Sequence, residues 1–277
     1  MKTTKLLFLL TLIFTGLTFS SCSSDDDNEG GGSSVNFGPK NVFTGDLPKT
    51  IGLSTIKYNS DGLLEEVLST TEKVTFEYPS QTKSTGNTVA VIMKVNDLQY
   101  PEDSYTVKFA IGSNGFASRA LQTYADNSTD TWEFSYNRDG QLNYMKRSEG
   151  DNEVTNITYA DGNITGIKME SDDKSEGVYT TSIGYTSDAH PNGIENKGCV
   201  MLFDITFGAD LDEMEVAYYA GLLGRATKKL PLKKTEQYVG ETTSDTYIFD
   251  WTLNTKGYPT KVSYMDGEYD ESLNLGW

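Results

Sequence analysis

The chain has 277 residues, of which 23 are Lys or Arg and 40 are Asp or Glu, with one His and two Cys. The net charge of −17 argues against binding to a nucleic-acid backbone, which requires clustered cations. One His and two Cys cannot form a multi-His or Cys-based zinc site, and two Cys exclude a fold held by several disulfides.

The N-terminal stretch is typical of an export signal. Two lysines near the start precede an apolar run at residues 6–19, which is too short to span a bilayer comfortably as a helix. Ser21 and Cys22 follow this run and resemble the lipobox of bacterial lipoproteins, which are cleaved before the Cys. We therefore predict a lipoprotein signal peptide at residues 1–21. The alternative is an ordinary secretory signal that happens to contain a Cys.

Cys22 is the predicted lipidation site, and several acyl chains on it would hold the mature protein stably on a membrane. Residues 22–34 form an acidic tether rich in Gly and Ser. Its first part resembles the signal that sends Bacteroides-type lipoproteins to the cell surface, with the residues Ser23, Ser24, Asp25, Asp26 and Asp27. We expect an outer-membrane lipoprotein exposed at the cell surface. The alternative is a solvated spacer that only keeps the domain off the membrane.

Residues 35–277 fit a single domain that is large enough to bury a sizeable core. Apolar and polar residues alternate along much of it, and the alternation predicts half-buried β-strands. The clearest segments are 74–78, 105–111, 132–136, 179–185 and 247–253.

A recurring turn separates these strands. The first copy is Tyr58-Asn-Ser-Asp61-Gly62. Related copies stand at 111–115, 136–140, 159–162 and 253–257. Asp-Gly and Asn-Gly favour tight hairpins because the backbone there needs a positive φ. The uneven spacing of the copies argues against a propeller or a solenoid. The predicted fold is all-β and mainly antiparallel, a curled meander or barrel-like sheet.

One segment departs from the strand pattern. Acidic residues open it, apolar residues then recur at helical spacing, and Gly224 and Pro231 follow. This pattern predicts one helix near 210–224. Its apolar side would pack at the open end or on the inside of the curled sheet.

Three features together resemble one family: the lipobox with its acidic tether, the Tyr-x-x-Asp-Gly hairpins, and the stretch from Tyr218 to Pro231. They are similar to the DUF4595 family of Bacteroides-type surface lipoproteins, a domain of unknown function with a porin-like fold. The resemblance covers most of residues 40–277 and implies a barrel-like fold. The family brings no catalytic residue to carry over.

A porin-like fold raises the question whether the strands span a membrane, since a transmembrane barrel also alternates apolar and polar faces. We predict that they do not. The chain carries a lipid anchor that such a barrel would not need, its strands and connections are irregular, and its mean hydropathy is −0.47.

The sequence contains no strong catalytic motif. His190 lies in a loop without a nucleophile motif, and Cys199 precedes an apolar run, as a buried structural thiol does. Asp61 and Asp139 resemble fragments of calcium loops, but the hairpins already account for them. We therefore predict no catalytic residue, no metal and no other cofactor. Whether the chain is an enzyme stays open, and a non-catalytic role is favoured.

Aromatic residues are the remaining candidates for binding. Trp132 and Trp251 share strand faces with other aromatics, which favours core packing, whereas Trp277 at the C-terminus is a candidate for stacking on a ligand. We predict a membrane-anchored binding module for an extracellular glycan or protein, without a nucleic-acid partner and with an open oligomeric state. The alternatives are a polysaccharide hydrolase that uses a pair of carboxylates and a purely structural envelope protein.

Overall fold

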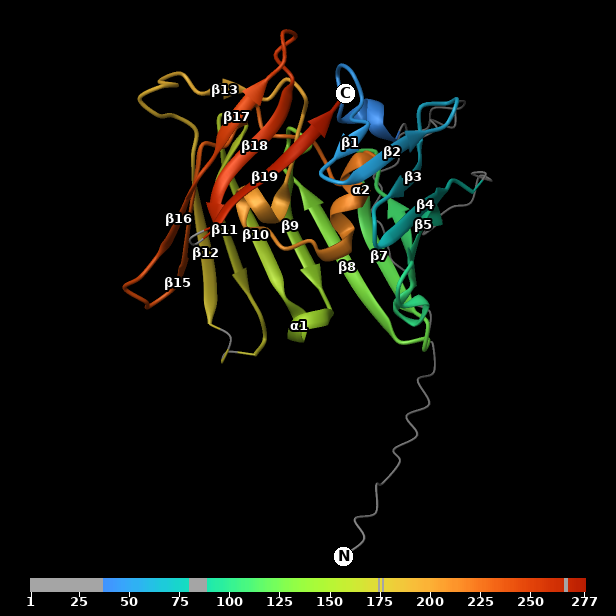
Figure 1. Ribbon diagram of the computed structural model, residues 1–277. Helices are drawn as coiled ribbons and strands as arrows, with labels where there is room; N and C mark the ends of the chain where they lie inside the picture. The colour runs from blue at the N-terminus through green and yellow to red at the C-terminus, as the bar shows by residue number, and fades with distance from the viewer. Residues whose placement is uncertain (1–36, 80–88, 174, 176, 267–268) are drawn as a thin grey trace, which may run out of the picture. The chain divides into compact units, whose positions relative to one another are not determined.

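The computed structural model describes residues 37–79, 89–173, 175, 177–266 and 269–277 (Figure 1). These residues belong to one compact unit, Val35–Trp277. The predicted signal peptide at 1–21, the lipidation site Cys22 and the tether at 22–34 lie outside the described residues.

The dominant element is a 17-stranded antiparallel sheet. Its strands are β1 (Thr50–Ile51), β2 (Ser54–Tyr58), β3 (Leu64–Leu68), β4 (Glu72–Glu77), β5 (Val89–Asp97), β6 (Tyr105–Ile111), β7 (Ala117–Tyr124), β8 (Thr129–Tyr136), β9 (Leu142–Arg147), β10 (Val154–Ala160), β11 (Asn163–Glu170), β12 (Val178–Gly184), β15 (Lys233–Tyr238), β16 (Asp245–Ile248), β17 (Asp250–Leu253), β18 (Pro259–Asp266) and β19 (Tyr269–Gly276).

The sheet curls into a nearly closed barrel. From β1 to β12 each strand pairs with the next one in the chain. β12 pairs with β15, and β16 and β17 are two halves of one strand interrupted at Phe249, one pairing with β15 and the other with β18. β19 pairs with both β18 and β1, so the two ends of the meander meet. The predicted all-β, antiparallel, barrel-like fold is confirmed.

The other elements are short. A separate two-stranded pair consists of β13 (Ile194–Glu195) and β14 (Lys229–Leu230). The helical turns are η1 (Pro39–Asn41), η2 (Pro101–Asp103), α1 (Glu149–Asn152), η3 (Phe203–Phe207), η4 (Asp212–Met214) and α2 (Glu215–Tyr219).

The recurring hairpins form as the sequence predicts. In the β8–β9 turn, the Asn137 side chain accepts hydrogen bonds from the backbone N–H groups of Asp139 and Gln141, each at 3.0 Å, while Gly140 has φ +78°. Asn59 and Asn254 accept the same pair of bonds in their own turns. An even number of strands separates the copies of this turn, so all of them lie at one end of the barrel, which we call the turn end (Figure 1).

The tyrosine residues of these motifs hold neighbouring hairpins together. Tyr136 donates a hydrogen bond to the carbonyl of Ala117 at 2.8 Å, and Tyr159 donates one to Leu142 at 2.7 Å. Each acceptor is the second residue after the glycine of the preceding copy of the turn. The repeated Tyr therefore links one hairpin to the one before it by satisfying a buried backbone carbonyl.

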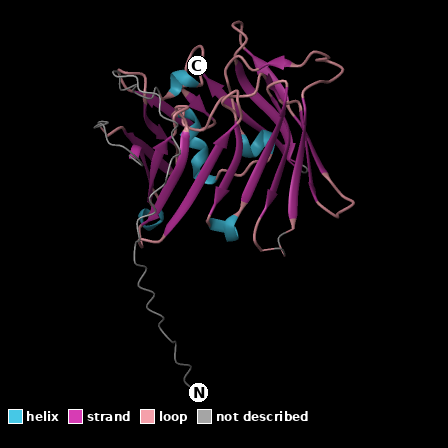
Figure 2. Ribbon diagram, turned by 180° about the vertical axis from the view of Figure 1, so that it is seen from behind, coloured by secondary structure: helices cyan, strands magenta, loops and turns pink. Residues whose placement is uncertain are grey.

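The lumen of the barrel is filled by the chain itself. Residues 199–224, which we call the plug, belong to the long connection between β12 and β15, and Figure 2 shows their helical turns enclosed by the strands. Hydrogen bonds fix the plug to the wall, from the Ala117 N–H to the Leu222 carbonyl at 2.8 Å and from the Thr181 hydroxyl to the Phe207 carbonyl at 2.9 Å.

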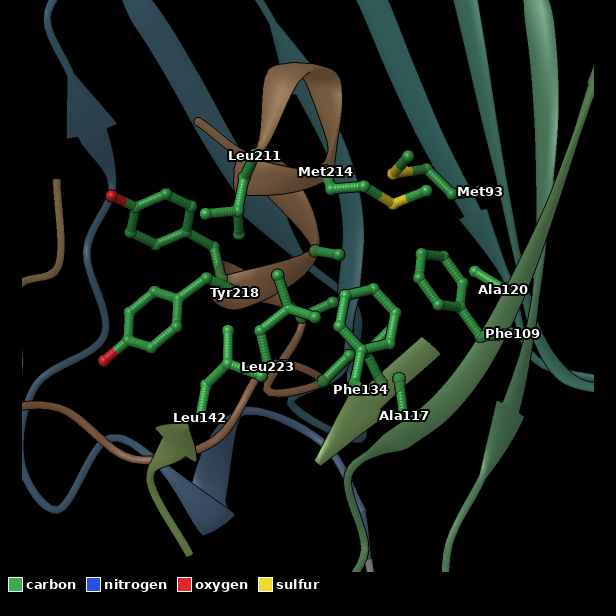
Figure 3. Close-up of a cluster of buried hydrophobic side chains, with 14 of the residues drawn as sticks. Met93, Phe109, Ala117, Ala120, Phe134, Leu142, Leu211, Met214, Tyr218 and Leu223 are labelled. Carbon is green, nitrogen blue, oxygen red and sulfur yellow. The ribbon is translucent and has the colours of Figure 1, made fainter. Parts of the chain in front are cut away.

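One continuous core joins the plug to the wall. Figure 3 shows Leu211, Met214 and Tyr218 of the plug beside Met93 and Phe134 of the wall, and all five side chains are buried. Two of the tryptophans are core residues as predicted, since Trp132 is 1% exposed and Trp251 is 8% exposed in a second cluster near β17.

The predicted helix near 210–224 is present but shorter. Only η4 and α2 are helical, because Asp212 at one end has φ +44° and Gly221 at the other has φ +75°. A Cβ on Gly221 would lie 2.2 Å from the carbonyl of Gly38, so the chain can pass the N-terminal segment only with glycine there. The apolar spacing marks residues that fill the lumen rather than a long helix.

Candidate functional site

A pocket opens where the plug meets the wall. Its volume is about 540 Å³, and it lies between α2 and the segment that runs from β1 to β4, with β19 beside them. Most of its lining is aliphatic, from Ile51, Leu53, Ile56, Val67, Leu202, Ile205, Val216 and Leu273. Leu53, at 82% exposed, places an apolar side chain in water at this site. We call this site the α2 pocket.

Glu215 is one of three acids that line this pocket. The Phe203 N–H donates a hydrogen bond to its Oε1 at 3.1 Å, which links two turns within the plug. Burial raises the pKa of Glu215 to about 7, and the nearby carboxylates of Asp204 and Asp210 contribute in the same direction. Near neutral pH the group is therefore divided between its protonated and charged forms.

Asp212 lines the same pocket and belongs to an ion cluster on its other side. Arg147 of β9, whose side chain is 11% exposed, forms ion pairs with Asp212, with Glu153 and, at 3.3 Å, with Asp210. Burial disfavours the charge of Arg147, but the carboxylates around it outweigh this and raise its pKa. The cluster fixes the strained turn at Asp212 to the barrel wall.

The third acid of the pocket is Glu72 of β4. Burial raises its pKa, and the carboxylate of Asp97 on the neighbouring strand adds to the effect. The α2 pocket thus combines an aliphatic surface with acids of which at least Glu215 is partly neutral at physiological pH. Such a site can hold an apolar surface and exchange hydrogen bonds with hydroxyl or amide groups.

Sequence reasoning missed this site. The acids at 210–215 predicted only a helix start, and nothing local signals that the opposite wall supplies Arg147. Trp277, the predicted stacking residue, is half-buried: its indole N–H donates to the Pro259 carbonyl at 2.7 Å, and its ring lies 4.9 Å from that of Tyr258. It lines no part of the α2 pocket, and its role in stacking stays a prediction.

The other residues that the sequence singled out lie apart from the α2 pocket. His190 is exposed in a turn with Ser187. Cys199 is half-buried rather than buried, with φ +51°. Within the described ranges, no three His, Cys, Asp or Glu side chains are grouped to hold a metal ion. Nor does any helix in those ranges have the length and apolar character needed to cross a membrane.

Fold and site together define a class of protein: a nearly closed antiparallel barrel with a filled lumen and a pocket beside the filling segment. The model of the family DUF4595, described as a domain of unknown function with porin-like fold, matches residues 55–261. The chain belongs to this family, which confirms the resemblance seen in the sequence.

Two solved structures share the fold. A porin-like protein from Bacteroides uniformis ATCC 8492 has a TM-score of 0.58 and 18% identity, over 80% of this chain and 88% of that one. A porin-like protein from Bacteroides vulgatus ATCC 8482 has a TM-score of 0.56 and 12% identity, over 84% of this chain and 99% of that one. At such identities the similarity shows the fold alone. Among curated proteins, no sequence matches this chain.

Proposed function

We propose that the chain is an outer-membrane lipoprotein, exposed at the cell surface, whose barrel binds an extracellular glycan or protein through the α2 pocket. The anchor and the address are supplied by Cys22 and the acidic tether behind it. The pocket is the observation that supports binding, because it presents aliphatic side chains to solvent beside acids that can form hydrogen bonds.

The outer face of the barrel supports anchoring by lipid rather than by the strands. Exposed ion pairs cover the wall, for example Lys57 with Glu65 at 3.1 Å and Lys168 with Glu170 at 3.1 Å. A membrane-spanning barrel needs an outward apolar band about 25 Å tall. The largest cluster of buried apolar side chains joins the wall to the plug, and the apolar side chains exposed on the outer strands are interspersed with charged ones.

The test is binding to an array of extracellular glycans and proteins by the full chain carrying Cys22→Ser. Leu53→Glu places a charge at the α2 pocket, and Leu98→Glu is the matched control, because Leu98 is 50% exposed and lines no part of that pocket. We expect Leu53→Glu to weaken any binding at least about tenfold and Leu98→Glu to leave it unchanged. Equal binding by all three proteins would rule out the α2 pocket as the binding site.

One observation favours a second candidate, a hydrolase that acts on surface polysaccharide. Glycosidases use a carboxylic acid with a raised pKa beside a second carboxylate, and the α2 pocket holds Glu215, with a pKa of about 7, together with Asp212. Release of reducing ends from polysaccharide, lost in both Glu215→Gln and Asp212→Asn, would establish this activity. Unchanged release in either variant would dismiss it.

A further inference from the structure

A second pocket lies at the turn end of the barrel. Its volume is about 690 Å³, and it is bordered by the η1 region, by the loop at 195–199 and by residues 225–228, which follow the plug directly. It shares no lining residue with the α2 pocket, and we call it the turn-end pocket.

Three cations line this pocket in a protein where acids outnumber bases by 40 to 23: Lys40, Arg225 and Lys228. Glu195 is the one acid of the lining. Several exposed bases of the wall form ion pairs with carboxylates, as in the pairs on β2–β3 and β3–β4. Across the described part of the chain, none of the three cations has a carboxylate within 4 Å.

The hairpin turns hold these cations in place. The stem of Lys228 packs so closely on Gly162 that a Cβ there would lie 2.7 Å from the lysine Cε, and the Lys228 N–H donates to the Gly162 carbonyl at 3.1 Å. Arg225 lies beside Gly140, where a Cβ would be 3.7 Å from the arginine Cδ, and its N–H donates to the Gly140 carbonyl at 2.9 Å. Cations that are already positioned lose little conformational entropy when a ligand binds.

Hydrogen bonds of a buried side chain hold one side of the pocket together. Asn196, which is 5% exposed, donates from its side chain to the carbonyls of Val200 at 2.9 Å and Thr227 at 3.1 Å, and its Oδ1 accepts the Val200 N–H at 2.8 Å. Cys199 lines the same pocket and is half-buried. The residues beside the cations are therefore held by hydrogen bonds. The Cys199 thiol can report whether a ligand occupies the turn-end pocket.

We propose that the turn-end pocket binds an anionic group, a carboxylate or a phosphate, of an extracellular ligand. Lysine and arginine form their strongest hydrogen bonds with such groups, and the planar guanidinium of Arg225 can hold two oxygens at once. The inference does not depend on the α2 pocket, because the two sites differ in residues and in charge.

Calorimetry on the full chain carrying Cys22→Ser tests the proposal with three probes. Polygalacturonate supplies carboxylates, pyrophosphate supplies phosphate, and dextran is the uncharged control. We expect at least one anion to bind, the binding to weaken as salt is added, and dextran to give no signal. Because Cys22→Ser leaves Cys199 as the one thiol of the chain, the anion that binds should also slow its alkylation by N-ethylmaleimide.

Single substitutions locate the site. Lys228→Gln and Arg225→Gln should each weaken binding about five- to tenfold, whereas Lys168→Gln, which removes a lysine from the outer wall, should not. The proposal fails if neither anion binds, if dextran binds equally well, or if Lys168→Gln weakens binding as much as the pocket variants do.

The comparison of polygalacturonate with pyrophosphate identifies which kind of ligand supplies the anionic group. Binding of polygalacturonate alone would support recognition of an acidic polysaccharide, and binding of pyrophosphate alone would support recognition of a phosphorylated headgroup or metabolite. Binding of both would support recognition of the charge that they share. Each of these three results upholds an anion site at the turn end.

Discussion

Glu215→Gln tests the electrostatics of the α2 pocket directly. In the folded protein the carboxyl is bonded to the Phe203 N–H within the plug, and burial raises its pKa from the ordinary 4.5 to about 7. Glutamine has nearly the same shape and keeps an oxygen for the Phe203 N–H, but it carries no charge. The substitution therefore removes the titration and little else.

The sign and size of the effect follow from proton linkage. Between pH 4.5 and about 7 the folded protein keeps a proton that the unfolded chain has released, so the free energy of unfolding falls as the pH rises through this window. A pKa difference of this size corresponds to about 3 kcal/mol. Glu215→Gln should thus gain about 3 kcal/mol relative to wild type between pH 4.5 and pH 8.

Urea unfolding of both proteins at several pH values measures this gain as a change in the free energy of unfolding. Glu65→Gln is the control, because Glu65 forms an exposed ion pair with Lys57 on the outer wall and should change stability by less than about 1 kcal/mol at any pH. If wild type and Glu215→Gln lose stability in parallel as the pH rises, Glu215 is not held protonated by burial, and the pocket electrostatics derived above are wrong.

Three further perturbations test other parts of the molecule. Gly221→Ala should cost about 3 kcal/mol or more in a thermal or urea unfolding experiment, because it meets backbone at 2.2 Å, whereas Gly240→Ala, with positive φ but open space around it, should cost about 1 kcal/mol. If the two substitutions lowered the free energy of unfolding equally, the backbone at Gly38 would have moved away from residue 221. Tyr136→Phe should lower the free energy of unfolding by about 1–2 kcal/mol, since it removes the hydroxyl donor from the Ala117 carbonyl and one of the two donors from the Leu222 carbonyl. Cys22→Ser should move the protein from the membrane fraction to the soluble fraction, and a variant that stays with the membrane would contradict lipidation there.

Local sequence carried most of the information about the sheet. An Asp-Gly turn needs only its own backbone, so the hairpin at Asp139 and Gly140 could be predicted from a few residues. The role of Asn137 was also readable, because a side chain that bonds backbone two residues further on is a local interaction. The tyrosine bridges were not, since Tyr136 bonds to Ala117, a residue on another hairpin.

The sequence predicted that the apolar side of the segment near 210–224 packs at the open end or on the inside of the sheet, but the irregular form of the plug and the two pockets escaped prediction for one physical reason. The spacing of Leu211, Met214 and Tyr218 fits a helix and also fits a short irregular segment surrounded by core on several sides. The nearly closed barrel determines which of the two conformations forms. Its lumen must be filled, and the connection between β12 and β15 enters it as a short irregular segment. Arg147 and Asp212 lie far apart in the sequence, so no local pattern could announce their ion pair.

The filled lumen sets the positions of the two proposed binding sites. A core packed from Phe109 to Tyr218 fills the lumen, so the two proposed sites lie at its margins, where the plug meets the wall. Both pockets lie at such places, one beside α2 and the other at residues 225–228, where the chain leaves the lumen. Backbone bonds tie Arg225 and Lys228, which follow the plug, to the turns at Gly140 and Gly162, so the cations of the proposed turn-end site are anchored to the hairpins. The same segment thus fills the core and supplies residues to both sites, so substitutions in it should affect stability and binding together, whereas substitutions on the outer wall should affect neither.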